Sequence, residues 1–340
     1  MKDELAELLI FPLETGAICA GDNTLFLNAP GLLHTKNFEQ AYFQTYDYAS
    51  YEHFKKKELL SGPDVPQQKY DRIFLAGTQH HRETLYHMAM ALDLLSEGGI
   101  LICAGLNHEG GKRLKKDMQK TGLAVHDLSK FKGRVVWAHK QDKDLNEAIL
   151  TQWEKDGQKQ DILSGRFLSR PGIFGWNKID AGSSLLAEYM PQEISGTVAD
   201  FGCGYGYLSC QILENSSNIT KIHIIDCDSR AVSLCEKNLR SLNHGAEIIP
   251  LWSDICLDHQ NIPENLDYII MNPPFHDGKE TDIKRGQAFI TSAHRCLKAG
   301  GQLWMVANTH LPYEKILGSH FKTVCEITQQ NGFKICHATK

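Results

Sequence analysis

The chain has 340 residues, of which 42% are hydrophobic and 23% charged, and its formal net charge at pH 7 is −5. A chain of this length has room for two domains with separate hydrophobic cores. The composition argues against a membrane-spanning protein, because no stretch approaches the ~20 uninterrupted apolar residues of a transmembrane helix. The negative charge argues against a protein that coats nucleic acid without specificity.

The beginning of the chain and its cysteines predict a cytoplasmic protein without a metal site. The segment MKDELAELLIFPLE mixes acidic with apolar residues and lacks the basic start and cleavage site of a secretion signal. Ten cysteines are scattered along the chain without any CxxC pair. Such cysteines are typical of a reducing compartment, whereas a zinc site needs paired ligands.

The N-terminal half has the pattern of an α/β domain. Residues 70–76 and 99–104 predict buried strands, and residues 83–96 between them have the apolar spacing of a helix. Residues 125–128 and 134–139 predict two further strands at the edge of the sheet.

Two basic runs in this half are candidates for phosphate contacts. They lie at residues 55–57 and 110–120, the second with five basic residues against one acidic residue. Gathered on one face they would bind an RNA backbone in a salt-sensitive way, although a solvated helix face gives the same pattern. His80 and His81 would point to opposite sides of a strand, so a polar strand end or loop accounts for them better than a metal site does.

A repeated pattern suggests that the chain contains two copies of one domain. The segment LSEGG at 95–99 and the strand after it are similar to residues 295–305. Residues 142–159 between the halves are mostly polar, include Trp153, and predict a partly helical linker. The first half lacks the motifs described next, so we interpret it as a degenerate copy of the second.

A strand in the second half runs into a glycine-rich loop. The sequence VADFGCGYGYLS at 198–209 places Gly202, Gly204 and Gly206 after an apolar segment that ends at Asp200. Glycines permit a tight turn and the close approach of a ligand, and the N-terminus of the following helix favours polar or anionic groups. The pattern is GxGxG, and a tyrosine stands where the dinucleotide motif GxGxxG requires its last glycine.

Two carboxylates follow at the ends of the next predicted strands. Residues 221–226 end in Asp226, which can accept hydrogen bonds from both hydroxyls of a ribose. Residues 247–251 lead to Asp254, which would lie near an adenine amine at the same edge of the sheet. We interpret Cys203, inside the glycine loop, as a small residue that fits there and not as a nucleophile.

The most informative motif follows a buried-looking strand at 266–271. It consists of Asn272, Pro273, Pro274 and Phe275. The two prolines stiffen the backbone where open α/β sheets place their ligands. The motif offers an amide oxygen, a free carbonyl and an aromatic face, a combination that suits a planar amine.

The other predicted elements complete an alternating α/β pattern. They are two helices, one strand and a terminal hairpin: 229–242 with Ser229 as N-cap, 287–297, 302–307, and 322–328 paired with 333–338. The hairpin is predicted by the dipeptide Asn331-Gly332, the strongest short turn signal. Pro312 and Tyr313 follow the single strand and either contact the ligand or close the edge of the sheet.

In this order, the glycine loop, the two carboxylates and the NPPF motif resemble the class I S-adenosylmethionine-dependent methyltransferases. Three segments, at residues 173–186 (IFGWNKIDAGSSLL), 272–278 (NPPFHDG) and 306–317 (VANTHLPYEKIL), resemble the ribosomal RNA guanine-N2 methyltransferase family. The small-subunit methyltransferase C type is the nearest match and the large-subunit type the next. The resemblance covers residues 165–340 most clearly.

The resemblance implies a fold and a division into domains. It implies two tandem Rossmann-like methyltransferase domains, a degenerate one over residues 1–155 that stabilises the protein or presents RNA, and a catalytic one over residues 165–340. The catalytic sheet would have seven strands and end in an antiparallel hairpin. The implied partner is ribosomal RNA, within the small subunit or its precursor, and the duplicated layout suits a monomer.

The resemblance also implies a set of site residues. Asp180 and Gly182 match a segment that lies over the cofactor in the family. The residues implied to bind S-adenosylmethionine are Asp180, Gly182, Asp200, Gly202, Gly204, Gly206, Asp226, Asp254 and Asn272. Those implied to act in catalysis are Asn272, Pro273, Pro274 and Phe275. The Asn272 oxygen and the Pro273 carbonyl would bind the guanine amine and Phe275 would stack on the base, so positioning supplies most of the catalysis.

Other activities compete with this interpretation. Methylation of guanine N2 in 23S ribosomal RNA is the nearest alternative, and a non-catalytic RNA-binding or ribosome-assembly module is another. A protein-glutamine methyltransferase implies tyrosine at position 275 and a helical N-terminal domain. A DNA-adenine methyltransferase needs a target-recognition region, for which the sequence offers no candidate.

Overall fold

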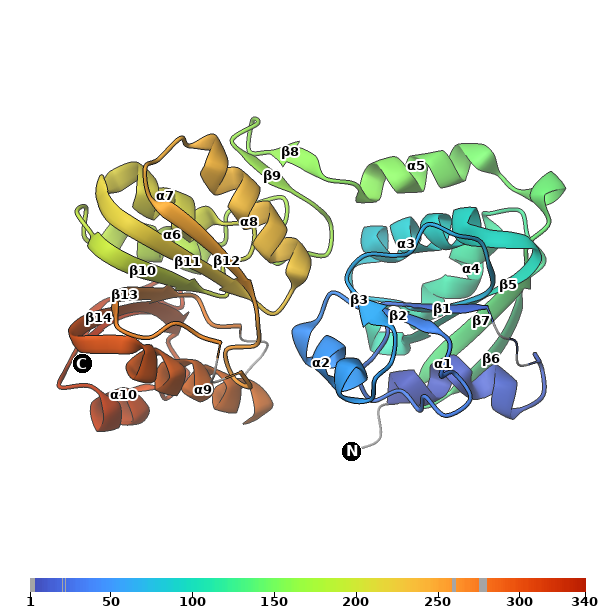
Figure 1. The fold of residues 1–340 in the computed structure, drawn as a ribbon, viewed down its shortest axis with the longest axis horizontal. Coiled ribbons are helices and arrows are strands. Elements are labelled where there is room, and N and C mark those ends of the chain that lie inside the picture. The colour runs from blue at the N-terminus through green and yellow to red at the C-terminus, as the bar shows by residue number, and fades with distance from the viewer. Residues whose placement is uncertain (1–3, 20, 22, 259–260, 275–279) are drawn as a thin grey trace. The chain divides into compact units, whose positions relative to one another are not determined.

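The chain divides into two compact units, each with its own sheet (Figure 1). The computed structural model describes residues 4–19, 21, 23–258, 261–274 and 280–340. The first unit comprises Met1–Gln160 and Arg170–Gly172, and the second Asp161–Ser169 and Ile173–Lys340. No helix among the described residues is both long enough and apolar enough to cross a membrane.

Both units are built on a seven-stranded sheet with the same strand order. In the first the order is β3-β2-β1-β4-β5-β7-β6, and in the second it is β12-β11-β10-β13-β14-β16-β15. The first sheet comprises β1 Thr24–Leu27, β2 Tyr42–Gln44, β3 Ser61–Gly62, β4 Tyr70–Ala76, β5 Leu95–Leu106, β6 His126–Lys130 and β7 Gly133–His139. The second comprises β10 Ser195–Phe201, β11 Asn218–Asp226, β12 Glu247–Trp252, β13 Leu266–Met271, β14 Leu297–Asn308, β15 Thr323–Gln330 and β16 Phe333–Thr339.

In each sheet all strands are parallel except the last one in sequence, which pairs antiparallel with both of its neighbours. The predicted duplicated α/β fold with a terminal hairpin is therefore confirmed. At the hairpin turn Asn331 has a φ of 52° and Gly332 a φ of 83°, the positive pair that a type I′ turn requires.

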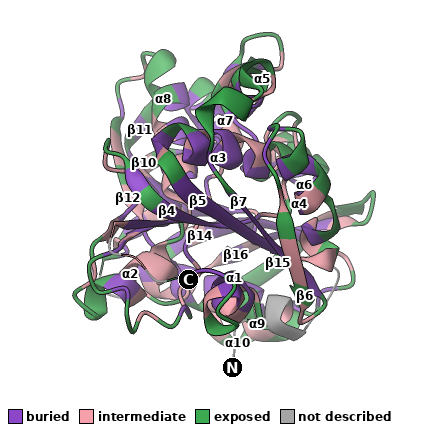
Figure 2. Cartoon of the chain, turned by 90° about the vertical axis from the view of Figure 1, so that its right-hand side faces the viewer, coloured by how far each residue is buried: buried purple, intermediate pink, exposed green. Residues whose placement is uncertain are grey.

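Helices cover both sheets, whose central strands are buried, as Figure 2 shows for β4 and β5. The helices of the first unit are α1 Glu4–Glu14, α2 Tyr48–Lys56, α3 His81–Leu94, α4 Leu114–Gln119 and α5 Glu147–Gly157. Those of the second are α6 Ala181–Tyr189, α7 Tyr207–Asn215, α8 Ser229–Ser241, α9 Glu280–Cys296 and α10 Glu314–His320. A short two-stranded sheet joins β8 Gln160–Ile162 to β9 Phe167–Ser169, and 3-10 turns lie at Asn107–Glu109, Gly111–Arg113 and Asp142–Asp144.

The repeated sequence pattern corresponds to a repeated hydrogen-bond arrangement. The backbone N–H of Gly98 donates to the carbonyl of Lys140 over 3.0 Å, and that of Gly300 donates to the carbonyl of Lys340 over 2.9 Å. The Nζ of Lys140 donates to the Leu95 carbonyl, and the Nζ of Lys340 donates to the carbonyl at the corresponding first residue of β14. Lysines at corresponding positions therefore stabilise the same helix-to-strand junction in both units.

Two local predictions differ from the structure. The segment 142–159 is not merely a linker, because α5 packs against α3 and Trp153 lies in the core of the first unit at 6% exposure. Gly157 permits this contact, since a Cβ atom there would lie 2.2 Å from the Tyr86 side chain. Helix α8 is capped by Asp228, whose carboxylate accepts from the Arg230 N–H, and not by Ser229.

The predicted basic run and the histidine pair of the first unit form contacts within that unit. The predicted basic run at 110–120 contains Asp117, a buried carboxylate that accepts from His81 Nε2 over 2.7 Å and from Lys120 Nζ over 2.8 Å. His80 lies in the loop before α3, as predicted, whereas His81 is the first residue of that helix. Within the described part of the chain no group of three or more His, Cys, Asp or Glu side chains could hold a metal ion.

Replacement of Trp153 by alanine tests whether α5 belongs to the first unit. We expect the Trp153→Ala variant to lose about 3–5 kcal/mol of unfolding free energy, because a large side chain leaves a cavity in a packed core. Thr151→Ala on the exposed face of the same helix should change it by less than about 0.5 kcal/mol. Urea unfolding of both variants is the measurement, and equal small effects would show that α5 acts only as a linker.

Candidate active site

Four polar side chains gather at the carboxyl ends of neighbouring parallel strands. Asp200 belongs to β10, Asp226 ends β11, and Asp254 and Asn272 follow β12 and β13. Because these strands run in the order β12-β11-β10-β13, their ends form one edge of the second sheet. This is the edge at which open α/β sheets bind ligands.

Two adjoining cavities open at this edge. The smaller, of about 50 Å³, is lined by side chains that include Asp180, Ser183 and Asp200. The larger, of about 220 Å³, is lined by Asp226 and Asp254 together with apolar residues.

The glycine loop forms the wall between the two cavities. Gly202 and Gly204 line both of them, with φ angles of 81° and 53°. The loop is held by the sheet, since the N–H of Gly202 donates to the Ile225 carbonyl and the N–H of Gly204 donates to Asp226 Oδ2 over 2.9 Å. At either glycine a Cβ atom would point into open space, with no neighbour closer than 3.8 Å. The backbone can therefore approach a ligand closely here.

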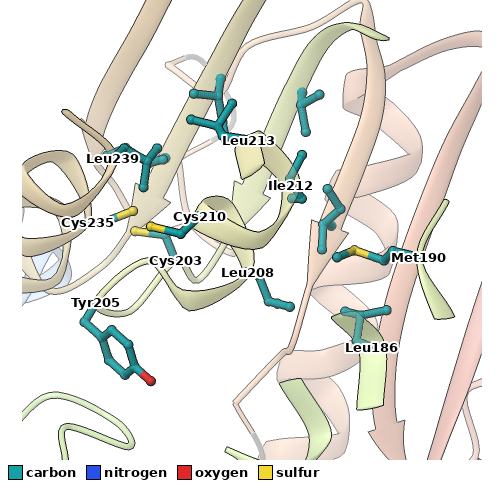
Figure 3. Close-up of a cluster of buried hydrophobic side chains, with 14 of the residues drawn as sticks. Leu186, Met190, Cys203, Tyr205, Leu208, Cys210, Ile212, Leu213, Cys235 and Leu239 are labelled. Carbon is teal, nitrogen blue, oxygen red and sulfur yellow. The ribbon is translucent and has the colours of Figure 1, made fainter. Parts of the chain in front are cut away.

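The third glycine of the loop lies in a packing contact, and its contact with the cofactor stays a prediction. Gly206 lies outside the cavity walls, and a Cβ atom there would lie 2.8 Å from the Sγ atom of Cys235 on α8. It therefore allows the start of α7 to pack on α8. Cys203 and Cys210 belong to the same buried cluster (Figure 3). Burial raises the pKa of both thiols well above the ordinary value, so neither is a nucleophile at neutral pH.

Asp200 is a buried carboxylate with one oxygen left for a ligand. Its side chain is 1% exposed, and Oδ2 accepts a 2.5 Å hydrogen bond from the Ser209 hydroxyl. Oδ1 is buried and has no hydrogen-bond partner among the described residues. Burial raises the pKa of Asp200 to about 7. A cationic donor in the smaller cavity would satisfy this oxygen and stabilise the ionised form.

Asp226 and Asp254 supply the acceptors of the larger cavity. Asp226 accepts from the backbone N–H groups of Gly204 and Asp228, each over 2.9 Å, and desolvation raises its pKa to about 6. Asp254 accepts from the Cys256 N–H over 2.8 Å, and Arg285 lies 3.9 Å from its other oxygen. Both carboxylates are held by backbone donors, which fixes where they can accept from a ligand.

The amide of Asn272 is oriented by two acceptors. Its Nδ2 donates to Asp180 Oδ2 over 2.9 Å and to the Ser183 hydroxyl over 2.8 Å. A carboxylate only accepts hydrogen bonds, so the opposite amide orientation would place two oxygens against each other. Oδ1 is consequently the free end, and this buried atom has no partner in the part of the chain that the structure describes. Asn272 therefore presents an acceptor where the two cavities meet.

Other predicted site residues have different surroundings. Pro273 and Pro274 line the larger cavity, whereas Phe275 lies outside the described residues, so its stacking function stays a prediction. Gly182 is absent from both cavity walls, and a Cβ atom there would lie 3.0 Å from the Phe333 ring. It permits α6 to pack against the hairpin, and its contact with the cofactor stays a prediction.

Tyr313 lies in the core of the second unit, whereas Ser183 belongs to the site. Tyr313 is 1% exposed and packs in the core of the second unit, so it closes the sheet edge and does not reach a ligand. Ser183 was not predicted, although it stands three residues after Asp180 and its backbone N–H donates the N-cap hydrogen bond to the Asp180 carboxylate. That spacing is a known cap signal, but its second function, contact with Asn272, depends on the tertiary fold.

The cavities contain further residues that no motif indicated. Phe174 lines both cavities, and Phe289 and Arg285 of α9 line the larger one. Phe174 lies in the IFGWNKID segment, which carries the family resemblance, but the sequence does not indicate that its side chain faces a ligand. The α9 residues come from a helix whose sequence shows only amphipathic spacing.

The sequence is similar to a known family and to several named relatives. Residues 164–337 match the model of the methyltransferase small domain. Ribosomal RNA small subunit methyltransferase C of Acinetobacter baumannii (strain AYE) is 31% identical, over 86% of this chain and 87% of the relative. The protein of the same name from Pasteurella multocida (strain Pm70) is 28% identical, over 85% of this chain and 84% of the relative.

A solved structure has the same two-unit fold. It is the T. thermophilus 16S rRNA N2 G1207 methyltransferase in complex with AdoMet and guanosine. The two chains superpose with a TM-score of 0.79 over 99% of this chain and 92% of that one, at 23% sequence identity. At this identity the likeness concerns the fold.

The raised pKa of Asp200 predicts a pH dependence of stability. An ordinary aspartate titrates near 3.9 when unfolded, so the folded protein holds a proton that the unfolded chain has lost between about pH 4 and 7. Wild-type stability should therefore fall as pH rises through this range, by about 1.4 kcal/mol per unit from this group. Asp200→Asn removes this pH-dependent contribution to stability. In urea unfolding at several pH values, the unfolding free energy of the variant relative to wild type should rise with pH. A difference that does not change with pH would contradict the raised pKa of Asp200.

Proposed function

Since the chain belongs to the methyltransferase small domain family, and within it to the ribosomal RNA small subunit methyltransferase C family, we propose that it methylates the exocyclic N2 of a guanine in 16S ribosomal RNA. The methyl donor is S-adenosylmethionine, and the reaction takes place in the cytoplasm on the small subunit or its precursor. The observation that carries the proposal is the Asn272 amide, whose acceptor oxygen is free at the junction of two cavities.

The residues at the sheet edge fit S-adenosylmethionine. Asp226 can accept from the ribose hydroxyls and Asp254 from the adenine amine, while Ile255 and Phe289 supply apolar surface for the ring. The unpartnered Oδ1 of Asp200 in the smaller cavity fits the ammonium group of the methionine part. The glycine loop passes between both cavities and leaves room for a ligand backbone. When bound, the cofactor supplies an electrophilic methyl group on a sulfonium.

The site binds and orients an amine and needs no strong base. The lone pair of guanine N2 is delocalised into the ring, so the amine is a poor nucleophile until its geometry changes. Asn272 Oδ1 and the Pro273 carbonyl can accept hydrogen bonds from the two N–H groups of the amine. The nitrogen lone pair then points away from these two oxygens. Holding the two reactants in such an orientation lowers the barrier of the reaction, and this is the main contribution of a protein that forms no covalent bond to them. The nitrogen becomes acidic only as the new bond forms, and water can then take the proton.

The proposal assigns no cofactor to the first unit. At the edge that corresponds to the glycine loop, Asn28 follows β1 with a φ of 53°, and its N–H donates to Gln44 Oε1 over 2.9 Å. The Asn28 amide contacts His87, whose other ring nitrogen contacts Tyr46. Gln44 and His87 are fully buried. These side chains occupy the edge, and we propose that residues 1–155 stabilise the protein and present RNA while residues 165–340 catalyse.

Transfer of labelled methyl groups tests the proposed substrate. Purified full-length protein is incubated with labelled S-adenosylmethionine and with undermethylated small subunits, large subunits and their naked RNAs. Label on a guanine N2 of 16S ribosomal RNA is the expected result. Label on 23S ribosomal RNA alone would replace the proposal with the large-subunit alternative, and binding of the cofactor without transfer to any RNA would contradict it.

Asn272→Ala tests the function of the amide. We expect at least a hundredfold loss of transfer rate, because the loss of one positioned transition-state contact typically costs that much. Affinity for S-adenosylmethionine should change by less than about threefold, since the main cofactor contacts are elsewhere. Asn215→Ala, at the exposed end of α7, is a matched control that should transfer normally. A variant with weak cofactor binding and normal turnover at saturation would contradict the assigned function.

A further inference from the structure

Phe174 lines both cavities of the site. The smaller and the larger cavity share four lining residues: Phe174, Gly202, Gly204 and Asn272. Two of these belong to the glycine loop, and the third is the amine-binding residue. Phe174 therefore lies where the two cavities meet and where the substrate must approach.

The Phe174 ring is displayed by an anchored turn. Ile173, its neighbour, is 4% exposed and packs in the core, whereas Phe174 is 61% exposed. The turn is closed by the Trp176 N–H, which donates to the Ile173 carbonyl over 3.1 Å. The Tyr205 hydroxyl donates to the Lys178 carbonyl over 3.1 Å and ties this segment to the glycine loop. An exposed phenylalanine alone means little, but this one is fixed at the rim of a binding site.

The proposed placement of the cofactor indicates what the ring would contact. With the methionine part in the smaller cavity and the adenosine part in the larger one, the sulfonium lies where the cavities meet. We propose that Phe174 places its aromatic ring against the sulfonium of S-adenosylmethionine as a cation–π contact, an inference that rests on the proposed function. The face of an aromatic ring attracts a cation within about 6 Å of its centroid, and more so where water is excluded.

This contact discriminates between the cofactor before and after transfer. When the S–CH3 bond breaks, its electron pair stays on sulfur and the methyl group bonds to the amine nitrogen. The sulfur thus changes from a sulfonium cation to a neutral thioether. A cation–π contact is lost with the charge, whereas apolar contact with the same ring remains. Phe174 should therefore favour binding of S-adenosylmethionine over the product S-adenosylhomocysteine.

Titration calorimetry with both ligands tests the contact on the full-length protein. Phe174→Leu keeps most of the apolar surface and removes the π face. We expect its Kd for S-adenosylmethionine to rise roughly three- to tenfold, with a change of less than about twofold for S-adenosylhomocysteine. Phe174→Tyr, which keeps an aromatic ring, should stay close to wild type for both ligands. Ile327→Ala, at an exposed apolar residue of β15, should leave both affinities unchanged.

Each other outcome overturns the proposal. Equal weakening of both ligands by Phe174→Leu would make the ring an apolar wall only. Unchanged binding of both ligands, with a lower transfer rate to RNA, would assign the ring to the target base. Unchanged binding and unchanged transfer would show that the ring has no function in the site. If wild-type protein binds neither ligand, the proposed function itself fails. Failure of the proposed function is thus distinguishable from failure of the Phe174 contact alone.

Discussion

The hydrogen bonds from Asn272 Nδ2 to Asp180 and Ser183 are the constraint on which the site depends. An asparagine amide can rotate, and with its NH2 end outward it would repel an amine. The Asp180 carboxylate prevents this because it accepts and cannot donate. Asp180 also caps α6 through the Ser183 N–H. The same carboxylate thus begins a helix and fixes the orientation of an amide at the end of β13, so helix and strand are aligned by one residue.

The two units show that the fold alone does not make the site. They share the strand order and the lysine-anchored junction before β5 and β14, yet among the described residues the glycine loop, the carboxylates and Asn272 line cavities in the second unit. The difference lies in short loops: glycines leave space after β10, whereas Asn28 and its buried partners fill the space after β1. Function therefore depends on a few loop residues presented by a rigid sheet.

Much of this arrangement could be predicted from the sequence, because it depends on local patterns. Strand ends, the glycine loop and the rigid Asn-Pro-Pro segment are each encoded within a few residues. Contacts between distant segments were missed, such as Ser183 with Asn272 and Trp153 with the core of the first unit. Gly182 and Gly206 show a second limit, since a glycine required for packing has the same sequence signature as one that faces a ligand.

An exchange of the side chains at positions 180 and 272 shows whether Asp180 sets the orientation of residue 272. Asn272→Asp alone places two carboxylates against each other, whereas adding Asp180→Asn restores one donor and one acceptor across the same contact. The measurement is the single-turnover rate of methyl transfer at saturating cofactor and neutral pH. We expect the double variant to be faster than Asn272→Asp alone. A double variant that is no faster, or slower, would show that Asp180 does not set this orientation.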